Sequence, residues 1–254
     1  MVSHPEPSGP IIRSSLVVIG LAAITWAGVV LAAPTATGLD PAADRIVVGD
    51  PFKTDDLNRL ASDLEVARHG TPPRARALRN AVIVAVRQTE EAVRDGRRTE
   101  IEDRLGALGP MLDRATALAP CDGFLWLARF WHRNLRDGFD GESLALLAAS
   151  YRVAPREGWL AVRRSPLALA AFSRMDAPLR GLVVDEFVGL VNSHLGPTAE
   201  VFVTAGWAAR GALLPALAGA SEVSRRNFAR AVYQLGYDVD VPGIARPDTR
   251  PWSR

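Results

Sequence analysis

The residue types that most often hold metal ions are few in this chain and widely separated. They are His4, His69, His132, His194 and Cys121. No two histidines have the spacing of a zinc-binding helix, and a single cysteine can form neither a thiolate cluster nor an intramolecular disulfide bond. We therefore expect no metal and no other cofactor. His132 is expected to be structural. Cys121 is either a small residue near a helix start or a lone thiol, free or paired with another chain.

Carboxylates and hydroxyls also lack a recognisable catalytic arrangement. Asp185 and Glu186 are adjacent, so they point in different directions on a helix. Asp113, Asp122 and Glu157 are too dispersed to nominate the facing pair that a glycan-processing enzyme needs. No serine stands in a GxSxG elbow, and no glycine run matches a phosphate-binding or dinucleotide loop. The sequence predicts a protein that is not an enzyme, with a helical-array glycan-processing enzyme as the alternative.

Four side chains are candidate ligand contacts: Trp126, Trp159, Arg163 and Arg164. The two arginines follow about one helical turn after Trp159. A guanidinium in this place can face the concave groove of a helical-repeat protein, where peptides or anionic glycans bind. The alternative is a salt bridge or a carbonyl cap to the neighbouring helical hairpin.

The charge distribution argues against a nucleic-acid partner. The formal net charge is +2, and Lys53 is the sole lysine, so arginine supplies nearly all the positive charge. Arginines are interleaved with carboxylates, and no long stripe of one sign is visible. The densest basic patch is Arg225, Arg226 and Arg230, which either meets anionic lipid headgroups or serves surface solubility.

An uncharged apolar run precedes the part of the chain that carries these residues. Residues 14–33 read SSLVVIGLAAITWAGVVLAA, and about 20 apolar residues in a helix span a bilayer. Arg13 precedes the run while Asp40 and Asp44 follow it. The positive-inside tendency therefore places residues 1–13 in the cytoplasm and the bulk of the chain in a bacterial periplasm, anchored by one pass through the inner membrane. A signal peptide cleaved after Ala32 is the alternative, which would leave the protein free in the periplasm.

Beyond this run the sequence predicts three parts. Residues 34–52 contain Pro34, Gly38, Pro41, Gly49 and Pro51 and are expected to be a linker. Residues 53–236 form the exported helical-repeat domain. Helices are expected near 54–69, 75–96, 99–119, 157–172, 177–195, 198–217 and 221–235, with a hairpin that turns at Gly138 and Gly141 between the third and the fourth. Residues 237–254 are an extended tail, either packed along the helices or disordered.

One segment repeats with an offset of 35 residues. The matches are Ala115/Ser150, Leu118/Val153, Ala119/Ala154, Pro120/Pro155, Gly123/Gly158, Phe124/Trp159 and Leu125/Leu160. A period of about 34 residues is typical of the tetratricopeptide helical hairpin. Proline stops one helix and starts the next, since it cannot continue the hydrogen-bond ladder. The fold predicted is all-α: an α-solenoid of tetratricopeptide-like hairpins preceded by a single transmembrane helix.

Residues 112–174 resemble the tetratricopeptide-like region of a bacterial polysaccharide-biosynthesis group, the VpsP family. The resemblance is carried by Leu118-Ala119-Pro120, Trp126, Ser150, Pro155 and Arg163 or Arg164, and it covers about a quarter of the chain. It implies a part in making or exporting extracellular polysaccharide, and it supplies no catalytic residues.

Taken together, these features predict a membrane-anchored scaffold or binding protein that supports polysaccharide synthesis or export. Its expected partners are the inner membrane and envelope proteins of such an assembly. The sequence leaves the oligomeric state open. The remaining alternative is an accessory protein of secretion or cytochrome assembly.

Overall fold

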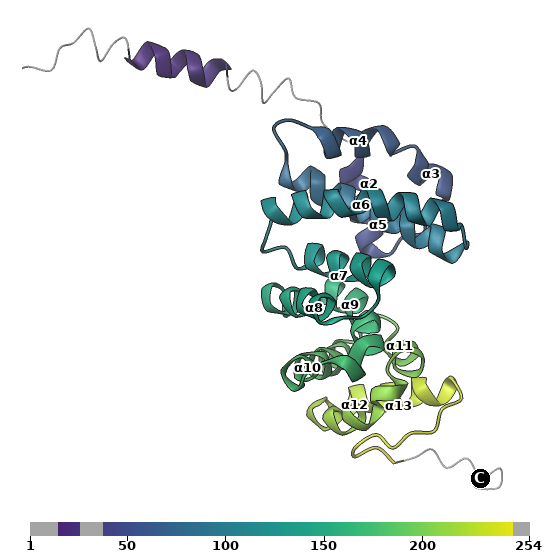
Figure 1. The fold of residues 1–254 in the computed structure, drawn as a ribbon. Coiled ribbons are helices and arrows are strands. Elements are labelled where there is room, and N and C mark those ends of the chain that lie inside the picture. The colour runs from purple at the N-terminus through teal and green to yellow at the C-terminus, as the bar shows by residue number, and fades with distance from the viewer. Residues whose placement is uncertain (1–14, 26–37, 246–254) are drawn as a thin grey trace, which may run out of the picture.

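The computed structural model describes residues 15–25 and 38–245, and every regular element in these residues is a helix. The all-α prediction is therefore confirmed for the described part of the chain. The labelled α-helices (Figure 1) are α2 (Leu39–Val48), α3 (Thr54–Asn58), α4 (Ala61–His69), α5 (Ala75–Arg94), α6 (Arg98–Leu118), α7 (Gly123–Asp137), α8 (Gly141–Val153), α9 (Gly158–Ala171), α10 (Ala177–Ser193), α11 (Thr198–Thr204), α12 (Arg210–Ala216) and α13 (Glu222–Gln234). Short 3-10 helices cover Phe172–Arg174, Trp207–Ala209 and Leu217–Gly219.

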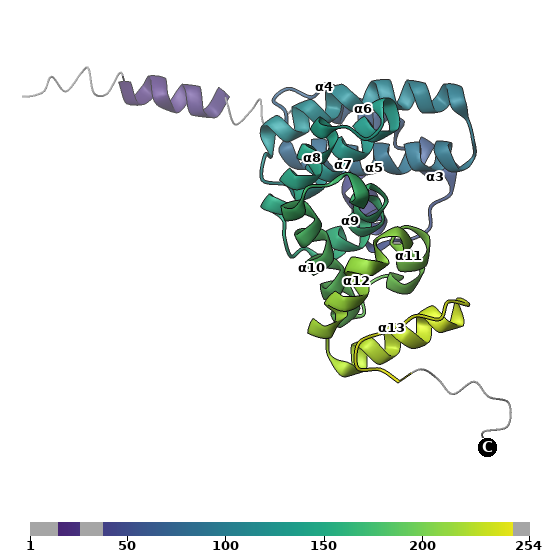
Figure 2. The same cartoon turned by 60° about the horizontal axis from the view of Figure 1, so that its bottom comes forward.

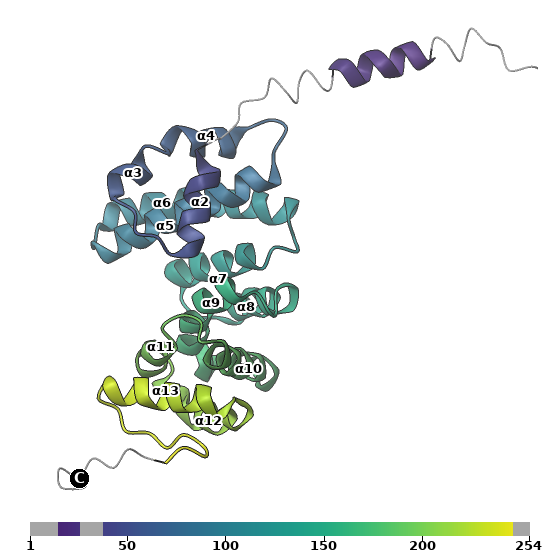
Figure 3. The same cartoon turned by 180° about the vertical axis from the view of Figure 1, so that it is seen from behind.

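From α2 to α13 the helices stack along one axis roughly in chain order (Figures 1 and 3). Helix α5 packs mainly on α6, α7 on α8, and α9 on α10. The turns at 95–97 and 138–140 are short, so the first two pairs are antiparallel hairpins. Helix α7 also contacts α5 on one side and α9 on the other. The first helices of three successive pairs are therefore neighbours (Figure 2).

The 35-residue repeat seen in the sequence appears as two junctions of nearly equal backbone conformation. Helices α6 and α8 end at Leu118 and Val153, and the residues that follow have φ/ψ of −135°/66° (Ala119) and −140°/65° (Ala154). Helices α7 and α9 begin after N-caps with φ/ψ of −85°/108° (Asp122) and −83°/104° (Glu157). The residues that the sequence repeat aligns therefore have the same backbone conformation at the α6–α7 and α8–α9 connections.

The expected linker 34–52 is wrong in its central part, because Leu39–Val48 forms helix α2. Leu39, Ala42, Ala43 and Ile46 are buried at helical spacing, and α2 packs on α5. Pro41 lies in the first turn, where its missing N–H costs no helix hydrogen bond. Gly49, with φ of 95°, ends the helix in the left-handed conformation. The supposed linker residues are thus the start and stop signals of a short helix.

Two expected helices are interrupted. The helix expected over 54–69 is divided into α3 and α4 near Arg59 and Leu60. The helix expected over 198–217 ends at Thr204, and the chain turns by 83° before continuing through Trp207–Gly219. Gly206 is needed at this bend, because a Cβ there would lie 3.1 Å from the Cα and the carbonyl oxygen of Phe202.

The C-terminal part of the core is held by aromatic rings from separate helices. Phe187 of α10, Phe202 of α11 and Phe228 of α13 have ring centroids 5.3–6.0 Å apart. Residues 237–245 follow without helix and pack on this region: Val241 is buried, and the carbonyl of Pro242 accepts a hydrogen bond from Arg225. The described part of the expected tail therefore packs along the helices, while 246–254 lie outside the described residues.

Among the described residues, no single helix is long and apolar enough to cross a membrane. Ser15–Thr25 is a shorter apolar helix, and α11 together with Trp207–Gly219 meets the length and composition criteria only as a bent pair. The expected anchor 14–33 extends through residues 26–33, which lie outside the described part of the chain. The membrane anchor therefore stays a prediction.

Candidate functional site

A groove opens where the first helices of the three stacked pairs meet. Its cavity has a volume of about 200 Å³. The lining residues come from α5, α7 and α9: Val86, Glu90, Phe124, Leu127, Ala128, Trp131, Arg163, Pro166 and Leu167. We call this cavity the α5/α7/α9 groove. It is mostly apolar and carries one carboxylate and one guanidinium.

Helical spacing explains why each helix contributes to the same surface. On α7 the lining positions are 124, 127, 128 and 131, which lie on one face of a helix. On α5 they are 86 and 90, and on α9 they are 163, 166 and 167, again at intervals of three or four. The buried residues Leu125 and Phe130 of α7 lie outside this stripe. One helix therefore supplies both core contacts and a groove lining.

Glu90 is the acidic group of the groove. Burial raises the pKa of its carboxyl group, against the opposing positive charges of Arg163, Arg87 and Arg94. Its one ion-pair contact among the described residues is long, 3.8 Å from Oε2 to Nη1 of Arg87, and 32% of the side chain is exposed. Glu90 accepts no hydrogen bond within the described part of the chain. Its oxygens are therefore free to accept one from a ligand.

Arg163 is the basic group of the groove and also ties α9 to α2. Its Nη2 donates to the carbonyl oxygen of Ile46 near the C-terminal end of α2. The same carbonyl also accepts the Gly49 N–H at 3.2 Å, so the arginine adds a second hydrogen bond at the C-terminal end of α2. Arg163 makes no other hydrogen bond with the described residues. Its remaining N–H groups are available beside the groove.

Arg164, predicted as a groove contact, is instead completely buried. It forms a salt bridge with Glu186 of α10, whose side chain is 5% exposed, and donates to Ser150 Oγ at 3.1 Å and to the Ala154 carbonyl at 3.1 Å. Its guanidinium carbon lies 3.8 Å from the ring centroid of Tyr151. The prediction of a groove contact is therefore wrong for Arg164. The alternative, a salt bridge with a carbonyl cap, describes its actual role.

The two predicted tryptophans are half-buried but do not line the groove cavity. Trp126 donates its indole N–H to the carbonyl of Pro120 at 2.7 Å, which holds the α6–α7 junction. Trp159 packs on Phe124, with ring centroids 5.7 Å apart, and its ring lies 5.7 Å from the guanidinium carbon of Arg79. Of the four predicted contacts, Arg163 is the one that reaches the cavity.

Sequence reasoning missed Glu90, Leu127 and Leu167 as groove residues. The sequence signal for the α7 residues is the apolar stripe at positions 124, 127, 128 and 131, which is too wide to be covered by one neighbouring helix. Glu90 carried no such signal, because it lies in a run of alternating charges like many surface positions. Only the packing of α5 beside α7 brings it to the groove.

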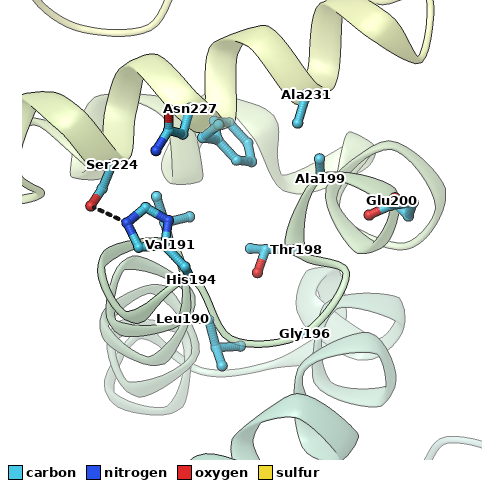
Figure 4. Close-up of a pocket in the computed structure, with 11 residues that line it drawn as sticks. Leu190, Val191, His194, Gly196, Thr198, Ala199, Glu200, Ser224, Asn227 and Ala231 are labelled. Carbon is cyan, nitrogen blue, oxygen red and sulfur yellow. Dashed lines mark hydrogen bonds between the residues drawn. The ribbon is translucent and has the colours of Figure 1, made fainter.

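A second cavity of about 200 Å³ lies between the end of α10, the start of α11 and α13 (Figure 4). His194 and Ser224 lie next to each other in its lining, with 3.4 Å between Nε2 and Oγ. Ser224 is only 2% exposed and also accepts a hydrogen bond from Ser221 at 2.8 Å. A buried hydroxyl with these contacts joins the end of α10 to the start of α13.

No group of three or more histidine, cysteine, aspartate or glutamate residues in residues 15–25 and 38–245 could hold a metal ion. His132 is buried, and its Nε2 lies 2.9 Å from the carbonyl oxygen of Leu105, which is the structural role predicted for it. Cys121 is exposed near the start of α7. Comparison of the chain with protein-family models, with curated proteins and with solved structures finds no match.

Proposed function

We propose that this protein is a non-catalytic, membrane-anchored scaffold whose helical hairpins bind a protein partner in the α5/α7/α9 groove. The groove itself carries the proposal, because it is the place where an apolar surface and two incompletely hydrogen-bonded charges meet. Its composition suits recognition, since binding sites combine apolar lining with a few polar groups that fix orientation.

The arrangement expected of such a scaffold is a solenoid of tetratricopeptide-like hairpins. The matching α6–α7 and α8–α9 junctions and the contacts of α7 with both α5 and α9 support it. In stacked hairpins each unit buries its face on the next, and the first helices line one continuous surface. The groove lies on that surface.

The cellular setting is also part of the proposal. The apolar run 14–33 would anchor the chain in the inner membrane, with residues 34–254 in the periplasm. The resemblance of residues 112–174 to the VpsP family directs the scaffold to polysaccharide synthesis or export. Envelope proteins of such an assembly are then the expected partners.

An enzymatic function has no comparable support. Asp122 caps α7 through the Phe124 N–H at 2.9 Å and pairs with Arg79 at 2.6 Å. Glu186 is engaged by Arg164 and Tyr151. Glu91, which is 5% exposed, pairs with Arg87 at 3.3 Å. These acidic residues of low exposure thus have structural contacts that account for their positions.

Site-specific photocrosslinking in native membranes tests the proposal. Trp131 is replaced by p-benzoylphenylalanine in the groove, and Trp126 is replaced in the same way as the matched control. Both are half-buried tryptophans of α7, and only Trp131 lines the cavity. The scaffold function predicts one discrete protein adduct from position 131 and none at that mass from position 126. Equal adducts from both positions, or none from position 131, would rule out a partner in the groove.

A further inference from the structure

The size of the α5/α7/α9 groove limits what it can hold. A cavity of about 150 Å³ lined by apolar side chains accommodates a molecule as large as benzene. The groove cavity, about 200 Å³, therefore has room for one large apolar side chain and not for two. Burying such a side chain would contribute most of the affinity, since apolar area is the main source of binding free energy.

The polar groups of the groove show what must accompany that side chain. Glu90 has acceptor oxygens without a hydrogen bond, and Arg163 has N–H groups left over after its bond to Ile46. Glu90 lies on α5 and Arg163 on α9, whereas the apolar floor of Leu127, Ala128 and Trp131 comes from α7 between them. A complementary ligand presents a donor on one side of its apolar group and an acceptor on the other.

The charges near Glu90 indicate that the donor is neutral. Arg163, Arg87 and Arg94 all act on this carboxyl group. A ligand ammonium or guanidinium would be repelled by these three positive charges, which outnumber the negative charges of Glu90 and Glu91. A neutral N–H avoids this repulsion and still hydrogen-bonds to a carboxylate, which is stronger than a bond between neutral groups.

An acyl chain would fit the apolar residues of α7 but would not complement Glu90 and Arg163. It would displace water from Glu90 and Arg163 without offering either a hydrogen bond. Leaving a polar group unpaired on burial weakens binding about tenfold or more for each group. A residue within an extended peptide offers an N–H, an apolar side chain and a C=O in one unit.

We infer that the α5/α7/α9 groove binds one large apolar residue of an extended peptide segment, whose backbone N–H donates to Glu90 and whose C=O accepts from Arg163. This inference rests on the scaffold function proposed above and specifies the chemistry of its partner. The preferred residue is of leucine or phenylalanine size.

Ligand-detected NMR on the full-length protein in lipid nanodiscs tests the inference with defined probes. The reference probe is acetyl-Ala-Leu-Ala-amide. The comparison probes are the same peptide methylated on the leucine nitrogen, the peptide with alanine in place of leucine, free leucine, and decanoate. The reference peptide should bind, and the dissociation constants of the N-methyl and alanine peptides should be at least tenfold higher.

Two pairs of measurements connect the effect to named residues. Ala128→Leu fills the cavity and should abolish binding, whereas Ala170→Leu adds the same atoms at an exposed position of α9 and should leave it unchanged. Glu90→Ala should weaken binding of the reference peptide and remove the difference between it and the N-methyl peptide. If removing Glu90 abolishes the effect of N-methylation, the leucine N–H and Glu90 are coupled, which identifies the hydrogen bond between them.

The inference is overturned if decanoate or free leucine binds more tightly than the capped peptide, or if the N-methyl peptide binds equally well. A failure of the inference differs from a failure of the scaffold function. A discrete adduct from position 131 without peptide binding would keep the scaffold and discard the backbone chemistry. Peptide binding without any adduct would keep the groove chemistry and remove the evidence for a resident partner.

Discussion

Gly123 and Gly158 occupy equivalent positions at the starts of α7 and α9, yet substitution by alanine should affect them differently. A Cβ added at Gly123 would lie 2.3 Å from the Cβ of Ala154 and 3.0 Å from Cδ2 of Leu160. A Cβ added at Gly158 would meet only the Cδ1 of Leu195, at 3.0 Å. The first clash is with a short, buried side chain that cannot move without the backbone at the end of α8, and the second is with the end of a flexible side chain.

The magnitudes follow from this difference. Alanine is up to about 1 kcal/mol more favourable than glycine in a helix, while inserting a methyl group into a well-packed contact costs about 1–3 kcal/mol. Gly123→Ala should therefore lower the free energy of unfolding by about 1–2 kcal/mol. Gly158→Ala should change it by less than about 0.5 kcal/mol or increase it, because Leu195 is exposed and can rotate away.

Urea unfolding followed by helical circular dichroism measures both values. The double variant Gly123→Ala with Ala154→Gly is the control, because it removes the nearest atom that the new Cβ would meet. It should recover most of the loss caused by Gly123→Ala, apart from the conformational-entropy cost of glycine at position 154, which lies just beyond the end of α8. Equal destabilisation by the two single variants, or no recovery in the double variant, would refute the packing of the α6–α7 junction described above.

Three further substitutions have definite expected outcomes. Glu186→Ala leaves the buried charge of Arg164 unpaired and should cost about 3–5 kcal/mol in thermal unfolding. The Arg133 guanidinium holds the pKa of Asp140 well below its usual range, so the ionised Asp140 carboxylate stabilises the fold at neutral pH and this stabilisation is lost in acid. Asp140→Asn should therefore reduce the change of the free energy of unfolding with pH below about pH 4. Burial raises the pKa of the Glu90 carboxyl group, so ionising it destabilises the folded protein as pH rises through that pKa. Glu90→Gln should therefore raise Tm relative to wild type at pH 7, and by a smaller amount at pH 4.

Local signals in the sequence were enough for the helices from α5 to α10 and for the repeat. The α6–α7 and α8–α9 junctions are marked by Pro120 and Pro155, whose effect on the backbone does not depend on the rest of the fold. Helix α2 is not predicted from the sequence because Pro41 resembles a turn signal, although proline in a first turn is compatible with a helix. The same proline thus predicts opposite outcomes depending on where the helix starts.

The groove depends on information that local patterns lack. Glu90 and Arg163 come from helices far apart in the chain, and only the stacking of α5, α7 and α9 brings them to one cavity. Arg163 and Arg164 are adjacent, and one residue step on a helix turns a side chain by about 100°. That step separates a groove residue from a completely buried one. Sequence could nominate the pair, but the packing of α10 through Glu186 decides which member faces inward.

The most direct test of the groove as the binding surface is the yield of the photocrosslinked adduct at position 131 in two backgrounds. Ala128→Leu fills the cavity from within α7, and Ala170→Leu makes the same change at an exposed position of α9. The account predicts that the adduct disappears with Ala128→Leu and persists at wild-type yield with Ala170→Leu. An adduct that survives filling of the cavity would mean that the partner contacts Trp131 from outside the groove, which would contradict the central claim.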